Sequence, residues 1–172
     1  MIYRFRDQSP DIGQGVFVAP DAVVIGRVRI GRHSGVWFGS VIRGDVDRIV
    51  IGEETNIQDL CVVHVDAAAP AVIGNRVTVG HRAILHGCRV EDECMVGMGS
   101  VIQSRARIGS HSIVASGSVV REGFEVPAGT LAAGVPAVVK RELTDVEIDY
   151  IGELADIYIG RARLYLDSGQ FT

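Results

Sequence analysis

The stretch VEDECMVGMGSVIQSRARIGSHSIVASGSVVREGFEV, residues 90–126, repeats an aliphatic residue at every sixth position: Val90, Val96, Ile102, Ile108, Val114, Val120 and Val126. A helical period of 3.6 does not place apolar residues six apart, and an ordinary strand alternates briefly and then stops at a turn. A sustained period of six therefore predicts a chain that forms one short strand after another around a single core.

The same period extends back towards the N-terminus with three changes of frame. The earlier positions are Ile12, Val18, Val24, Ile30, Val36, Ile42, then Ile51, Ile57, Val63, then Ile73, Val79 and Leu85. Small or β-branched residues recur four positions later through the first block, at Val16, Ala22, Val28, Ser34, Ser40 and Val46. Nineteen such positions are too many for chance in a Val/Ile-rich chain, and we expect both sets to face inward.

Each unit of six is expected to form one strand and one turn, and three units to close a triangular coil. Nineteen units then give about six coils of parallel strands, stacked roughly 4.8 Å apart. We label the three sides A, B and C, with Val63 on side A, Ile73 on side B and Ile57 on side C. Residues 11–136 resemble the hexapeptide-repeat superfamily of parallel β-helices. That resemblance implies a left-handed coil, an exception to the usual right-handed crossover.

A helical pattern follows the repeat. Thr144 and Glu147 have the spacing of a capping box, and apolar residues then recur at helical intervals, at Ile148, Ile151, Leu154, Ala155, Tyr158, Ala162 and Tyr165. We expect a helix over about 145–167 that packs along one outer face, with Tyr158 or Tyr165 reaching a site at an edge as the alternative. The predicted fold is all-β with a C-terminal α-helix, in a single domain of residues 1–172.

Composition excludes several classes of function. No apolar run approaches the roughly 18–20 residues of a membrane span, and the opening MIYRFRDQSP lacks the apolar region of a secretory signal. Three cysteines without a CxxC pair indicate reduced thiols and a cytoplasmic location. A net charge of −4 without a basic cluster argues against nucleic acid as a partner. No glycine-rich phosphate-binding motif is present.

The stretch VTVGHRAILHG, Val77–Gly87, contains His81 and His86. In the repeat, the chain turns a corner of the coil between them. The repeat places Arg43, His64 and His86 in one column on side A, and Asp59 below His81 on side C. His81 is therefore not expected to join the other two within one chain. A copy related by a three-fold axis would bring side C of one subunit to side A of the next. Three imidazoles with an open fourth position form the ligand set of a catalytic zinc site.

The motifs RGD (43–45), NIQD (56–59), VVH (62–64) and GHRAILHG (80–87) resemble those of the γ-class carbonic anhydrases. The resemblance implies a homotrimer with a metal at each subunit interface, held by His64, His81 and His86. It implies reversible hydration of CO2 to bicarbonate by metal-bound hydroxide. Imidazole ligands suit Zn²⁺, and Fe²⁺ or Co²⁺ as alternatives.

The same resemblance suggests roles for the neighbouring polar residues. Gln58 is expected to orient the nucleophile. Arg43 is expected to pair with Asp59 of a neighbouring subunit, and Arg43 with Asp45 to hold the trimer and, secondarily, to position the active site. Asn56 is either a nearby polar contact or a turn residue.

Other candidates have simpler interpretations. His33 and His111 fall at turn positions on side B and are expected to be surface residues. Cys61 and Cys94 fall at the small inward position and are expected in the core. Cys88 is expected at a turn and not as a ligand.

Two departures from the best-characterised γ-class branch affect the expected rate of CO2 hydration. That branch has a glutamate where this chain has Val46, and a long acidic loop where this chain has VDAAAPAVIGNRVTVG (65–80), with Asp66 as its carboxylate. The chain is most similar to the short-loop branch, and slow proton export is expected. The alternative functions are an acyl-CoA thioester hydrolase, a hexapeptide acyltransferase and a non-catalytic assembly subunit.

Overall fold

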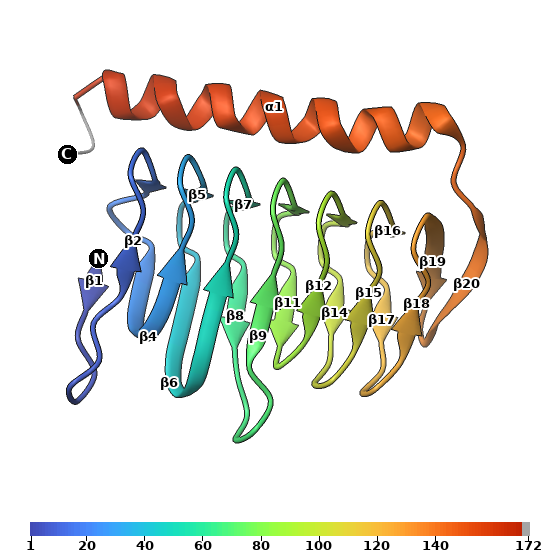
Figure 1. Ribbon diagram of the computed structural model, residues 1–172, viewed down its shortest axis with the longest axis horizontal. Coiled ribbons are helices and arrows are strands. Elements are labelled where there is room, and N and C mark those ends of the chain that lie inside the picture. Colours follow the sequence, from blue (N-terminus) through green and yellow to red (C-terminus); the bar gives the residue numbers. More distant parts are fainter. Residues whose placement is uncertain (170–172) are drawn as a thin grey trace.

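The computed structural model describes residues 1–169. The chain winds into a stack of three-sided coils, with one long helix lying along the stack (Figure 1). The side A strands are β4 (Val23–Ile30), β6 (Val41–Ile51), β8 (Val62–His64), β11 (Ile84–His86), β14 (Val101–Ile102) and β17 (Val119–Val120). β1 (Ile2–Tyr3) pairs in parallel with the start of β4. The rungs of side A confirm a stack of about six coils.

Sides B and C complete each coil. Side B consists of the second halves of β4 and β6 together with β2 (Asp11–Ile12), β9 (Ala71–Ile73), β12 (Arg89–Val90), β15 (Arg107–Ile108) and β18 (Glu125–Val126). Side C consists of β3 (Phe17–Val18), β5 (Gly35–Val36), β7 (Asn56–Ile57), β10 (Thr78–Val79), β13 (Met95–Val96), β16 (Ile113–Val114) and β19 (Thr130–Gly134). β20 (Ala137–Glu142) runs antiparallel to β19. The repeat pattern predicted neither β1 nor β20, because neither belongs to the period of six.

The aliphatic residues of the repeat stack in register from coil to coil. On side A the aligned residues are Val24, Ile42, Val63, Leu85, Ile102 and Val120. All of them are fully buried. Burying one such side chain contributes roughly 1.5–3 kcal/mol, so these ladders are a main source of the stability of the stack.

The residues that point outward differ between the sides. On side A they form a column of aliphatic residues: Val23, Val41, Val62, Ile84, Val101 and Val119. On side B the column is largely charged: Asp11, Arg29, Val50, Val72, Arg89, Arg107 and Glu125. Side C lies beneath the helix. Among the described residues, 1–169, side A therefore presents the aliphatic face that no other element covers.

The helix α1 (Asp145–Asp167) has the predicted bounds. Thr144 caps its N-terminus and forms both hydrogen bonds of the capping box with Glu147. The buried helix residues are Ile151, Ala155, Tyr158 and Ala162, which belong to the predicted stripe. No helix within residues 1–169 combines the length and apolar character that a membrane span requires.

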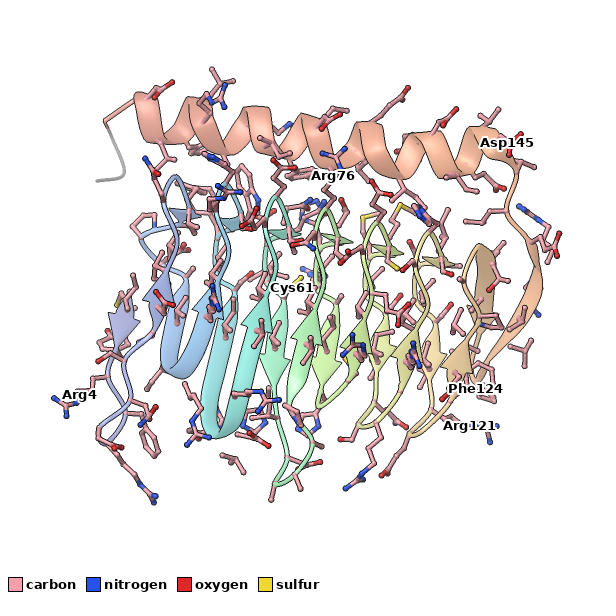
Figure 2. The ribbon with its side chains drawn as sticks, viewed as in Figure 1. Arg4, Cys61, Arg76, Arg121, Phe124 and Asp145 are labelled. Atoms are coloured by element: carbon pink, nitrogen blue, oxygen red, sulfur yellow. The ribbon has the colours of Figure 1, made fainter. Side chains whose placement is uncertain are left out.

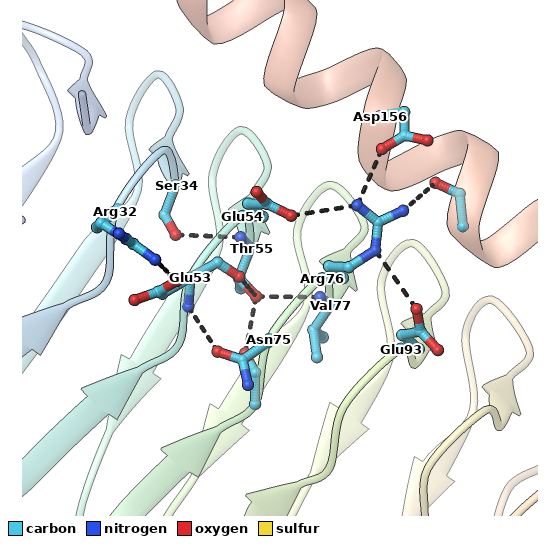
Figure 3. A network of polar contacts seen from close by, with 12 residues as sticks. Arg32, Ser34, Glu53, Glu54, Thr55, Asn75, Arg76, Val77, Glu93 and Asp156 are labelled. Carbon is cyan, nitrogen blue, oxygen red and sulfur yellow. Dashed lines mark hydrogen bonds and ion pairs between the residues drawn. The ribbon is translucent and has the colours of Figure 1, made fainter. Parts of the chain in front are cut away.

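Arg76, at the corner between sides B and C, fastens the middle of α1 to the coils (Figures 2 and 3). Its guanidinium contacts Asp156 at 2.9 Å and the carbonyl oxygen of Gly152 at 3.2 Å, both on the helix. It also contacts Glu54 at 3.2 Å and Glu93 at 3.4 Å, from the coils on either side. One side chain thus connects three neighbouring coils to the helix.

The structure adds to the prediction from the repeat at two positions, and at Val46 it corrects that prediction. The period predicts an inward Val46, but 53% of its surface is exposed. β6 carries extra residues where it crosses the A–B corner, and its pairing with β4 shifts register between Gly26 and Val28, so Val46 leaves the period. Cys88 lies at the expected corner, between β11 and β12, but its side chain is buried in the core, where the frame of the repeat loses one residue.

Candidate metal centre

His64 and His86 lie one above the other on side A, as the repeat predicts. They pair in register between β8 and β11. Their closest atoms are His64 Nδ1 and His86 Nε2, 3.1 Å apart. The two side chains are 18% and 32% exposed, so this pair can be reached from outside side A.

The other ring nitrogen of each histidine is hydrogen-bonded within the chain. His64 Nε2 lies 3.0 Å from Asp45 Oδ1, and His86 Nδ1 lies 2.9 Å from Ser104 Oγ. Burial opposes charge on Asp45, but hydrogen bonds from Arg43 and His64 outweigh it and lower the pKa of the carboxyl group. A carboxylate only accepts hydrogen bonds, so His64 Nε2 is the donor and Nδ1 keeps its lone pair.

This arrangement fits the donor set of a metal. Two imidazole nitrogens at about 2.0–2.1 Å from a tetrahedral Zn²⁺ lie roughly 3.3 Å apart, close to the 3.1 Å between His64 Nδ1 and His86 Nε2. Metal-binding histidines commonly hydrogen-bond their second ring nitrogen to a carboxylate or another polar group, and both do so here. Together these two side chains have the spacing to supply two of the four ligands of a tetrahedral site.

His81 lies apart from this pair, at the corner that follows β10 on side C. Its Nδ1 is 2.7 Å from Asp59 Oδ2, which leaves Nε2 as the ring atom for a ligand. Among the described residues, no three His, Cys, Asp or Glu side chains of one chain gather into a metal-ligand group. The second half of the site must therefore come from another copy if all three histidines hold one ion.

A polar network beneath His81 fixes its backbone. Gln58 is almost fully buried, and its Oε1 accepts a hydrogen bond from the backbone N–H of His81 at 3.2 Å. Gln58 Nε2 donates to Asn56 Oδ1 at 3.2 Å, and Asn56 Nδ2 donates to Thr78 Oγ1 at 2.9 Å. Asn56 is a buried residue of β7, so its interpretation as a turn residue is wrong.

Arg43 pairs with Asp45 of the same chain. This contact places the guanidinium next to the carboxylate that orients His64, in line with the expected positioning role. The expected pairing of Arg43 with Asp59 of a neighbouring subunit stays a prediction. Within a single chain, Asp59 contacts His81.

An apolar cavity of about 280 Å³ lies between side C and α1, beside His81. Gln58, His81 and Tyr158 are among its lining residues. Tyr158 thus lies near the candidate site, whereas Tyr165 packs against Phe17 at the far end of the helix. Of the two tyrosines considered from the sequence, only Tyr158 lines this cavity.

The remaining candidates are structural. His33 and His111 are exposed corner residues with φ of 56° and 55°. Cys61, Cys88 and Cys94 are free and buried, and burial raises the pKa of each thiol to about 12. Figure 2 shows Cys61 inside the stack. A thiol that keeps its proton is a poor metal ligand.

Comparison with known proteins shows the family of the chain. The family described as bacterial transferase hexapeptide (six repeats) matches residues 9–44 and 87–122. A carbonic anhydrase of Geobacillus kaustophilus is 40% identical over 165 residues, covering 96% of this chain and 91% of that protein. The mitochondrial gamma carbonic anhydrase 2 of Arabidopsis thaliana is 46% identical over 165 residues, covering 92% of this chain.

The chain belongs to the γ-carbonic anhydrase family. It spans about three fifths of the length of two plant members of that family, 59% and 60%. A hexapeptide transferase family protein from Anaplasma phagocytophilum has the same left-handed β-helix fold, with a TM-score of 0.93 and 42% identity over 96% of this chain and 98% of that one. The repeat family leaves residues 45–86 of this γ-carbonic anhydrase homologue unmatched, the segment that holds His64, His81 and His86.

Within this family member, the structure adds one residue that the sequence did not suggest. Ser104 contacts His86 but lies 18 residues further along the chain. Nothing in the repeat distinguishes it, because serine is common at the corners of the coil. The feature of the sequence that points towards this contact is Asp66, the carboxylate of the short loop. It lies 2.9 Å from the Ser104 hydroxyl.

Proposed function

We propose that the protein is a metal-dependent carbonic anhydrase that interconverts CO2 and water with bicarbonate and a proton. We further propose a homotrimer in which His64 and His86 of one subunit and His81 of the next hold one metal ion. The observation that carries this proposal is the pair of ring nitrogens 3.1 Å apart, each ring held from behind by the same chain.

The trimer is supported by the aliphatic column on side A. Val62 and Ile84 flank the two histidines there, and they are 36% and 40% exposed in a single chain. A neighbour that covers this column would bury apolar surface and bring its own C–A corner, with His81, towards His64 and His86. The assembly and the site would then form together.

A divalent metal held there would supply a Lewis acid that makes water a nucleophile near neutral pH. Zn²⁺ is our first candidate, with Fe²⁺ and Co²⁺ as alternatives for the same imidazole set. Asp45 and Asp59 would fix the orientation of His64 and His81. Gln58 would hold the His81 backbone, with its second amide hydrogen free to orient a bound water or bicarbonate. The free buried thiols fit a reducing compartment, and we propose the cytoplasm.

Mixing two inactive variants tests the shared site. His64→Ala and His81→Ala each remove one half of every interface, so each alone should lose metal and activity. Every mixed trimer contains one interface with neither lesion, so random mixing in equal amounts should restore about a quarter of the wild-type sites, given closed three-fold symmetry. Bound metal and CO2 hydration are both measured after joint refolding.

The matched control mixes His64→Ala with His86→Ala, which damage the same half and should restore nothing. A site formed within one chain would give no restoration in either mixture, and that result would overturn the shared geometry. Metal bound as expected together with thioester cleavage, but without CO2 hydration, would instead favour the acyl-CoA hydrolase. The proposed interface, which would bring three imidazoles together, favours metal chemistry over an acyltransferase with a single histidine base.

A further inference from the structure

Three successive coils meet behind His86. The loop between β8 and β9 projects beyond its neighbouring corners (Figure 1) and carries Asp66, whose backbone forms an isolated bridge with Ala69. Ser104, from the coil on the other side, is only 7% exposed. Its hydroxyl lies 2.9 Å from His86 Nδ1 and 2.9 Å from Asp66 Oδ2.

The direction of these hydrogen bonds follows from the number of protons. A serine hydroxyl has one hydrogen to donate, whereas a carboxylate can only accept. The hydroxyl of Ser104 therefore donates to Asp66, and its oxygen accepts the N–H of His86 Nδ1. His86 is left with a lone pair on Nε2, which faces the lone pair of His64 Nδ1 at 3.1 Å. Two such lone pairs repel each other unless a proton or a metal ion lies between them, so this pair of nitrogens is arranged to share a cation. Asp66 itself lies 3.6 Å from His86 Nδ1, so the hydroxyl is the closer contact.

We propose that Ser104 and Asp66 act as a positioning relay that holds His86 in the tautomer able to bind a cation. The short loop is the means by which Asp66 reaches this position. Without Asp66 the Ser104 hydroxyl is free to donate to His86 Nδ1, which moves the imidazole proton to Nε2 and blocks the ligand atom. This inference rests on the proposed metal site for its purpose, but the tautomer is a property of the metal-free protein.

The first experiment reads the tautomer directly. Long-range ¹H–¹⁵N spectra of metal-free protein labelled at histidine should show His86 protonated at Nδ1. Asp66→Ala should shift its population towards protonation at Nε2. Ser104→Ala, which removes both contacts, should leave a mixture. Ser112→Ala, which removes a buried hydroxyl that donates to Pro127 at 2.8 Å in another part of the stack, should leave the His86 signals unchanged.

The second experiment measures the affinity for Zn²⁺ and for Co²⁺ by competition with a chelator. Ser104→Ala and Asp66→Ala should weaken binding by about tenfold to a hundredfold, the usual effect of removing a partner of a ligating histidine. Asp66→Asn keeps an acceptor oxygen for Ser104 and should recover much of this loss. Melting temperatures identify any variant that is simply misfolded.

His86 protonated at Nε2 and not at Nδ1 in the metal-free wild type would overturn the relay, as would a tautomer that neither variant changes. If the wild type binds no metal although His86 carries its proton on Nδ1, the proposed function fails and the relay stands. Altered tautomers with unchanged affinity would show that the relay does not serve the metal, and would also contradict the proposal.

Discussion

His64, His81 and His86 each use one ring nitrogen to contact their own chain, which leaves the other available for the proposed metal. Asp45 holds His64, Ser104 holds His86 and Asp59 holds His81. Because each partner fixes the rotation of a ring, little side-chain entropy is left to lose when a cation binds. At the scale of single residues, the site is thus prepared by contacts within each subunit.

Proton release is the step at which single residues should limit the rate. CO2 hydration produces a proton, and Asp66, the carboxylate of the short loop, already accepts from Ser104. We therefore expect turnover of the wild type to rise with buffer concentration. Val46→Glu should raise turnover at low buffer several-fold and change kcat/KM little, because proton export follows CO2 conversion.

The exposed position of Val46 between Asp45 and Asp47 explains why this variant should work. A glutamate at this exposed position would be a titratable group next to Asp45, the residue that contacts His64, and could pass a proton to the solvent. Val46→Gln is the control of equal size without a titratable group, and a buffer titration of all three proteins at equal metal content is the measurement. If the turnover of the wild type does not depend on buffer concentration, another group already exports the proton.

At the scale of elements, the helix α1 matters to the site because it forms one wall of the cavity beside His81. Leu154 and Tyr158 of the helix line this cavity opposite Gln58 and His81. The position of the wall depends on the capping box at one end and on Arg76 in the middle. A helix that moves away from side C would open the cavity to solvent.

Arg76→Met should loosen this wall without unfolding the coils. The Arg76 side chain is 28% exposed and contacts three carboxylates, so we expect a loss of about 1–2 kcal/mol, reduced from the values for buried charged hydrogen bonds by solvent screening. Hydrogen exchange should accelerate in the middle of α1 and stay unchanged in β14 and β17. Arg163→Met, on the same helix, is the control, and equal exchange in both variants would contradict the role of Arg76.

At the scale of the whole molecule, the three sides of the coil have different surfaces. Side B is largely charged, side C is covered by α1, and side A presents the aliphatic column next to His64 and His86. The closed trimer that we propose would use side A once in each subunit and leave none of it exposed.

Ile84→Asp should therefore dissociate the trimer. A carboxylate buried in an apolar interface costs several kcal/mol, so sedimentation at micromolar concentration should show monomers that retain the β-helix by circular dichroism. Val72→Asp introduces the same charge at an outward position of side B and should leave the trimer intact. A trimer that survives Ile84→Asp would exclude side A as the interface.

The sequence by itself determined the period of six, the number of coils, the bounds of α1 and the column of His64 and His86. These features follow from local rules, since strand pairing in register converts spacing along the chain into position on a side. Only the tertiary structure decided what happens where the period breaks. The exposure of Val46, the burial of Cys88 and the relay from Asp66 through Ser104 to His86 arise at corners with inserted or missing residues. There the path of the chain depends on packing between coils, and two residues 38 apart can share a hydrogen bond that no repeat predicts.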